Sequence, residues 1–181
     1  MRTISLSPLL AALLTAGLIT ACSPKFDWRD YRSADAPYAV LFPGKPSSHT
    51  RNINLDGQEV KMNMAAAEVD GTTFAVGSAE LPDAAKAQAA IAAMKKAMVS
   101  NIGATVTSEK QADASASSNG VATRQTSIAI EAKGSRNGEP LLLVGRFVAK
   151  DKRVYQVIVV GREKHVEQEA VETFMSSFKL N

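Results

Sequence analysis

The feature that most constrains this chain is its N-terminus, where an apolar run ends just before the only cysteine of the 181 residues. The run, ISLSPLLAALLTAGLIT at residues 4–20, contains Pro8 and Gly17 and is shorter than the ~20 residues that a membrane-spanning helix needs. Arg2 is the only charged residue before it. This pattern is typical of an export signal that is removed from the mature protein. We therefore exclude residues 1–21 from the fold.

The residues before Cys22 resemble the lipobox of bacterial lipoproteins, although Ile19 stands where that family most often has leucine. The resemblance implies cleavage between Ala21 and Cys22, followed by attachment of a diacylglycerol and an N-acyl chain such as palmitate to Cys22. Several acyl chains anchor a protein durably where one is marginal. Ser23, rather than aspartate, after the cysteine implies sorting to the outer membrane of a Gram-negative cell.

The alternative is that Cys22 is a chance thiol beside an ordinary cleavage site. An exported domain in an oxidising compartment usually pairs its cysteines or has none, so a single thiol at the predicted cleavage point favours a covalent attachment site. We expect a lipoprotein of the cell envelope that faces the periplasm and contacts the membrane through Cys22.

The mature chain, residues 22–181, has the length of one domain. A chain of this size buries roughly 70% of its unfolded surface, so neither a disulfide nor a structural metal is required. Arg2 belongs to the removed segment, so twenty of the 21 basic residues remain against 18 acidic ones. The basic residues form no stripe interleaved with aromatics, which argues against nucleic acid as a partner.

Residues 22–37 have mixed charge and no apolar period, which predicts a lipidated tether before a single domain at residues 38–181. Phe26, Trp28 and Tyr31 allow two interpretations. Aromatic side chains so close to an acyl anchor could lie at the membrane interface, or they could fold back onto the domain. The second interpretation is favoured.

The first half of the domain alternates apolar runs with turn dipeptides. Asp56-Gly57 and Asp70-Gly71 favour hairpin turns between paired strands. We expect a four-stranded antiparallel meander, with strands at YAVLFPGKP from Tyr38, His49–Leu55, Gln58–Val69 and Thr72–Glu80. A helix then runs from an Asp83 N-cap to a stop at Gly103. Its apolar residues recur at helical spacing: Ala87, Ile91, Met94, Met98 and Ile102.

The second half repeats this plan. We expect a short strand at residues 104–109, a flexible loop QADASASSNG from Gln111, and strands at 122–133, 141–150 and 153–160. Because the last of these is apolar on both faces, it is predicted to be central and covered on each side. A terminal helix presents an apolar stripe: Val166, Ala170, Val171, Phe174 and Phe178.

These elements predict an α+β fold, in which an antiparallel sheet is built from two meanders, each followed by a helix that packs on the sheet in α/β/α-like layers. The opening LFPGKP and the closing F-x-x-S-F at Phe174–Phe178 resemble a PsbP-like or Mog1-like domain. They also resemble exported bacterial domains that begin with F-P-G-x-P. The resemblance covers most of residues 38–180 and implies a binding or accessory role, with no functional residues to transfer.

Few residues suggest chemistry. His49 and His165 lie beside no ligand or nucleophile at a recognisable spacing, and no nucleotide-binding, hydrolase or metalloprotease motif occurs. We therefore assign no catalytic residue, cofactor or metal. Met62 and Met64 alternate on one strand, so their thioethers face one side and could hold Cu(I). The favoured interpretation is that they fill the core beside Val60 and Ala66.

Three classes of function stay open. The favoured class is a non-enzymatic envelope module that docks on another protein. The second is a periplasmic carrier of a small ligand, with the methionine-rich helix at residues 84–102 as one wall of its pocket. The third is a hydrolase whose residues are dispersed along the chain, and it would need converging carboxylates or His49 in a deep cleft.

Overall fold

The structure is a computed structural model that describes residues 24–55, 57–118 and 121–181. Two antiparallel sheets and two α-helices confirm the α+β class. The large sheet has the order β3-β4-β5-β9-β8-β7-β6, and its strands are β3 (Ser47–Leu55), β4 (Gln58–Val69), β5 (Thr72–Glu80), β6 (Thr105–Ser118), β7 (Val121–Arg136), β8 (Glu139–Lys150) and β9 (Arg153–Arg162). The small sheet contains β1 (Arg29–Arg32), β2 (Tyr38–Phe42) and β10 (Lys179–Leu180).

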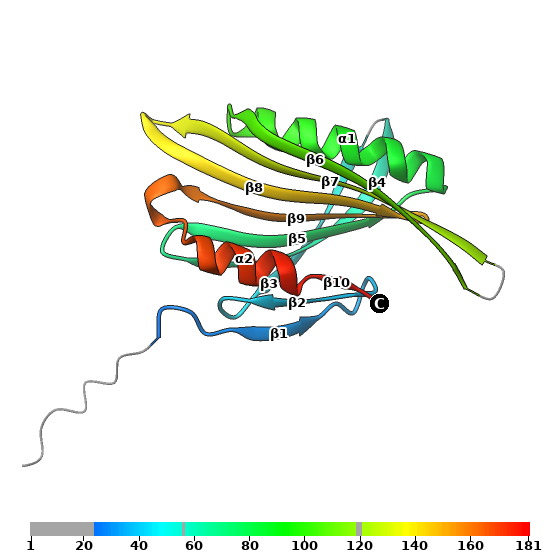
Figure 1. Cartoon of the computed structure of the whole chain (residues 1–181), viewed down its shortest axis with the longest axis horizontal. Coiled ribbons are helices and arrows are strands. Elements are labelled where there is room, and N and C mark those ends of the chain that lie inside the picture. The colour runs from blue at the N-terminus through cyan, green and yellow to red at the C-terminus, as the bar shows by residue number, and fades with distance from the viewer. Residues whose placement is uncertain (1–23, 56, 119–120) are drawn as a thin grey trace, which may run out of the picture.

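Strand β9 is at the centre of the large sheet, as its apolar pattern predicts. It pairs with β5 on one side and with β8 on the other. Val154 and Ile158 pack under α1 (Ala84–Asn101), whereas the alternate residues Tyr155 and Val157 pack on the opposite face. Figure 1 shows α1 along one side of the molecule, with α2 (Gln168–Ser177) and the small sheet on the other. Each face of the sheet therefore has its own hydrophobic core.

Helix α1 begins and ends where its sequence predicts. Asp83 is the N-cap, and its Oδ1 accepts a hydrogen bond of 2.8 Å from the backbone N–H of Lys86. Gly103 follows the helix with a φ of 59°, a left-handed conformation that glycine adopts without strain. Ala87, Ile91 and the other core residues of the helix face the sheet, so α1 is held by burial as well as by its cap.

The predicted four-stranded meander is wrong, because β2 does not pair with β3. Only β3, β4 and β5 form consecutive hairpins, and the Asp70-Gly71 turn between β4 and β5 has positive φ at both residues. Strand β2 instead lies between β1 and β10 in the small sheet. Its inward residues Tyr38, Val40 and Phe42 cover the face of the large sheet opposite α1. Burial of this apolar face, rather than proximity along the chain, selects the partners of β2.

Part of the expected tether is folded, since β1 lies within residues 22–37 and pairs with β2. Phe26, Trp28 and Tyr31 pack against the core on the α2 side, which is the fold-back interpretation. The Tyr31 ring meets Phe42 edge to face, with centroids 5.4 Å apart. Strand β1 and its aromatic neighbours therefore belong to the folded domain rather than to a tether.

The flexible loop predicted from Gln111 is also wrong where the structure describes it. Residues 111–118 belong to β6 and pair in register with β7, and residues 119–120 of the predicted loop lie outside the described residues. Because β8 begins to pair with β7 only at Gln125, the end of the β6–β7 hairpin extends past the rest of the sheet (Figure 1). Backbone pairing between β6 and β7 forms this ladder, and such pairing does not require an apolar period in the sequence.

The closing F-x-x-S-F motif joins α2 to the small sheet. Phe174 is fully buried, with its ring centroid 5.4 Å from those of Phe42 and Phe74. Ser177 Oγ accepts a 3.0 Å hydrogen bond from the backbone N–H of Leu41 and donates one of 2.7 Å to the carbonyl of Phe174. The two motifs that carry the family resemblance, LFPGKP and F-x-x-S-F, therefore contact each other.

Candidate functional site

A cavity of about 500 Å³ lies between the C-terminal half of α1 and strands β3 and β4. Its floor comes from the α1-facing residues of β4, and its wall comes from one side of the helix. The lining comprises His49, Arg51, Ile53, Asn54, Leu55, Met62, Met64, Ala66, Met94, Ala97, Met98, Asn101 and Gln156. Four of the six methionines of the chain therefore face one space. The size is that of a typical small-molecule site.

A glycine keeps the inner end of this cavity open. Gly77 of β5 lies opposite Met64 of β4 on one side and Gln156 of β9 on the other. A Cβ at Gly77 would come within 2.8 Å of Gln156 Cγ and 2.9 Å of Met64 Sδ. Without it, Gln156 Nε2 reaches across the strand and donates a 3.3 Å hydrogen bond to Met64 Sδ. A thioether is a weak acceptor, so this amide is held loosely for a buried polar group.

The predicted methionine pair lies in this cavity. Met62 is 3% exposed and packs in the core with Val60, and Met64 is partly buried beside it. Both face α1, as their alternation predicts, and Met94 and Met98 of the helix face them across the cavity. Cu(I) binding stays a hypothesis, while the core packing of Met62 agrees with the favoured interpretation.

The two predicted histidines lie in different places. His49 is exposed at the cavity on β3, opposite Met64 in the strand ladder. His165 ends the short 3-10 helix Glu163–His165, and its Nδ1 lies 2.9 Å from the carbonyl oxygen of Asp70. Thr72 Oγ1 donates a 3.3 Å hydrogen bond to the His165 carbonyl. His165 therefore has a structural role in joining a turn to a helix.

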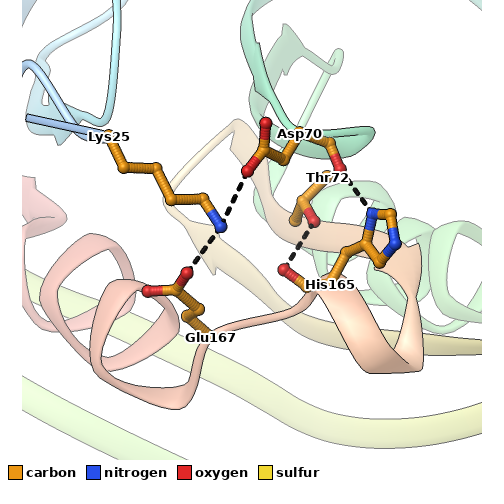
Figure 2. A network of polar contacts seen from close by, with 5 residues as sticks. All are labelled: Lys25, Asp70, Thr72, His165 and Glu167. Carbon is orange, nitrogen blue, oxygen red and sulfur yellow. Dashed lines mark hydrogen bonds and ion pairs between the residues drawn. The ribbon is translucent and has the colours of Figure 1, made fainter. Parts of the chain in front are cut away.

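The same network fastens the N-terminal segment to the domain (Figure 2). Lys25 Nζ lies 2.9 Å from Asp70 Oδ2 in the β4–β5 turn and 2.5 Å from Glu167 Oε1 at the start of α2. The hydrogen bond that Lys25 donates to Glu167 raises the pKa of Lys25, and the hydrogen bond that Lys25 donates to Asp70 lowers the pKa of Asp70. We call Lys25, Asp70 and Glu167 the N-terminal clamp.

The other described surfaces are weaker candidates for a binding site. A hollow of about 660 Å³ lies between α2 and strands β6 to β8, but Lys110, Glu131, Arg146 and Glu172 line it with mixed charge. Within residues 24–55, 57–118 and 121–181, no three His, Cys, Asp or Glu side chains gather as a metal site would require. None of the described helices is long and apolar enough to span a membrane. Ala21 and Cys22, the predicted cleavage and lipid-attachment residues, lie outside the described residues.

Sequence reasoning missed Gln156 and Arg51, which line the cavity, and Gly77, which lies beside it. Gln156 was detectable as the one polar residue in the apolar run of β9, and Gly77 as a glycine inside a strand, which often marks a close approach. Arg51 carried no signal, because an exposed arginine on a polar strand is ordinary. The helical methionines were expected as a pocket wall.

Comparisons with known proteins leave the family undetermined. Neither protein-family models nor curated proteins give a match. Among solved structures, this chain is similar to a crystal structure of PA94 from Pseudomonas aeruginosa, a protein of unknown function described as a putative regulator. The two are 14% identical over 76% of this chain and 84% of that chain, with a TM-score of 0.34. This score is too low to support an argument about fold or function.

Proposed function

We propose that this chain is a lipid-anchored binding protein of the bacterial envelope, which holds an apolar small molecule in the cavity between α1 and strands β3 and β4. The observation that carries the proposal is the convergence of four thioethers on a cavity of about 500 Å³ with one buried amide at its inner end. Methionine side chains are flexible and polarisable, so they adapt to apolar ligands of varied shape.

The composition of the lining favours binding over catalysis. Among its described lining residues the cavity has no carboxylate, and the ionisable side chains there are Arg51 and His49 at the outer strand. A hydrolase site of the kind considered from the sequence requires a general base with an orienting partner. His49 has no hydrogen bond to an acidic group among the described residues, so its imidazole lacks such a partner.

The N-terminal clamp supports the anchoring part of the proposal. Lys25 follows Cys22 by three residues, which span at most roughly 11 Å when fully extended. If Cys22 carries the lipid, the clamp holds the domain against the membrane surface rather than at the end of a long tether.

Binding is tested with residues 24–181 purified without detergent and titrated with the neutral apolar dye N-phenylnaphthylamine. We expect saturable dye fluorescence with one site per chain. Ala97 lines the cavity, so Ala97→Trp should fill it and abolish the saturable signal. Ala89 is an exposed alanine of the same helix that does not line the cavity, so Ala89→Trp is the matched control. Equal binding by both variants, or no binding by the wild type, would reject the proposed cavity.

Anchoring is tested in cells with the whole chain and its Cys22→Ala variant. We expect the wild type to fractionate with membranes and to carry the mass of the acyl chains, and the variant to lose that mass. Retention of the same mass shift by the variant would exclude Cys22 as the attachment residue. Protein docking, favoured from the sequence, stays a prediction, because no feature of the described surface identifies a partner.

A further inference from the structure

The charge around the methionine cavity is asymmetric. Arg51 and His49 lie side by side on the α1-facing side of β3, and no aspartate or glutamate is among the described residues that line the cavity. The guanidinium of arginine is always protonated. The described lining therefore offers a ligand one permanent positive charge.

Arg51 is available to a ligand. The described residues form ion pairs that engage Lys25, Lys95, Lys133, Arg153 and other cations, but Arg51 is in none of those pairs. Its side chain is exposed on the edge strand of the large sheet, beside Met62 in the ladder. An unpaired guanidinium next to buried thioethers has an apolar surface on one side and water on the other.

The register of the sheet places the charge at one end of the cavity. His49, Met64, Gly77 and Gln156 form one row across β3, β4, β5 and β9, and Arg51 lies at the start of the next row on the same face. Three strand spacings separate β3 from β9, which corresponds to roughly 14 Å. The row therefore runs from His49, beside the Arg51 guanidinium, over methionine, to the amide of Gln156 at the inner end.

We propose that the ligand of this cavity is an anionic amphiphile, specifically a monocarboxylate with an apolar chain. This inference rests on the proposed function and names the ligand class for the same cavity. The carboxylate accepts hydrogen bonds from Arg51 and His49 at the rim, and the chain lies over Met62 and Met64 under α1. Arginine suits the carboxylate because its two parallel N–H donors match the two oxygens.

The head group is tested by displacement of N-phenylnaphthylamine from residues 24–181. The competitors are dodecanoate, dodecanol and dodecyltrimethylammonium, which share one chain length and differ in charge, each used below its micelle-forming concentration. We expect dodecanoate to bind most tightly and the cation most weakly. Arg51→Gln should weaken the affinity for dodecanoate about tenfold, which is the effect of losing one charge-assisted hydrogen bond. The affinity for dodecanol should not change.

Two further variants separate a specific head-group contact from net charge. Arg51→Lys keeps the positive charge but loses the two parallel N–H donors, so it should retain only part of the preference for dodecanoate. Arg136 is exposed on β7 and does not line the cavity, so Arg136→Gln removes the same net charge elsewhere and should change no affinity. Unfolding curves of all variants should coincide with that of the wild type, because both arginines are exposed.

The outcomes distinguish this inference from the proposed function. If dodecanol displaces the dye as well as dodecanoate does, and Arg51→Gln changes neither, the carboxylate inference is wrong while the apolar cavity stands. Equal weakening by Arg51→Gln and Arg136→Gln would also overturn it, because net charge alone would then explain the effect. If the dye itself does not bind the wild type, the proposed function fails first.

Discussion

Two glycines of the large sheet test whether the methionine cavity is real free space. Both lie beside close neighbours, but the neighbours differ in kind. A Cβ at Gly77 would meet only side-chain atoms, Gln156 Cγ and Nε2 and Met64 Sδ, at 2.8–2.9 Å. A Cβ at Gly161 would lie 3.0 Å from the backbone Cα of Thr72 and 2.8 Å from its hydroxyl oxygen. Side chains that border a cavity can move, whereas the backbone of a paired strand cannot.

The magnitudes follow from this difference. Overpacking in a core typically costs about 1–3 kcal/mol, and replacement of glycine by alanine returns about 0.4–1 kcal/mol by restricting the unfolded chain. The overpacking cost of Gly77→Ala should be at the low end of that range, because Met64 and Gln156 can move into the cavity. We therefore expect the free energy of unfolding to fall by about 0.5 kcal/mol. The overpacking cost of Gly161→Ala should be at the high end, because the backbone of Thr72 cannot move, and we expect the free energy of unfolding to fall by about 2 kcal/mol.

The assay is urea and thermal unfolding of residues 24–181 for the two variants and the wild type. At about 2–4 °C per kcal/mol for a domain of this size, the Tm should fall by about 1–2 °C for Gly77→Ala and about 4–8 °C for Gly161→Ala. Gly77→Ala should also weaken dye binding, since the displaced side chains occupy the cavity. If Gly77→Ala were the more destabilising change, the space beside Met64 would not exist and the reasoning would be refuted.

Three further predictions concern the rest of the fold. Phe174→Ala should lower the free energy of unfolding by about 3–5 kcal/mol, because the ring is fully buried, and urea unfolding measures this loss. Ser177→Ala removes the hydroxyl that accepts a hydrogen bond from the part-buried backbone N–H of Leu41 in β2, so it should lower the free energy of unfolding by about 1–3 kcal/mol. The backbone amides of β2 should then exchange with solvent faster than those of β9. Lys25 holds the pKa of Asp70 below its ordinary value of 3.8, so the clamp contributes stability above that pH and loses it as pH falls through the lowered pKa. The fluorescence of Trp28, the only tryptophan, should report this acid step, and an unchanged step in Lys25→Met would show that another group causes it.

The pattern of the sequence predicted the elements whose signals are local. The cap at Asp83 and the helical spacing of apolar residues predicted α1, and Asp70-Gly71 predicted a hairpin turn that the structure confirms. The doubly apolar run of β9 predicted its central place in the sheet. In each case the determining interactions act within one strand, turn or helix.

The candidate site was predicted in part. Alternation placed Met62 and Met64 on one face, and helical spacing placed Met94 and Met98 on another. That the two faces enclose a cavity depends on how α1 crosses the sheet, which no local pattern contains. Arg51 joins the site only because β3 is the edge strand beside that cavity.

The sequence by itself determined α1, the Asp70-Gly71 turn and strands such as β9, because periodicity and capping act over a few neighbouring residues. Only the tertiary structure decided that β2 pairs with β1 and β10 rather than with β3, and that residues 111–118 extend β6. The partners of β2 are selected by the need to cover the apolar face of the large sheet, and the extension of β6 by backbone pairing with β7. The same long-range packing leaves the methionine faces of β4 and α1 apart, and so it creates the cavity on which the proposed function depends.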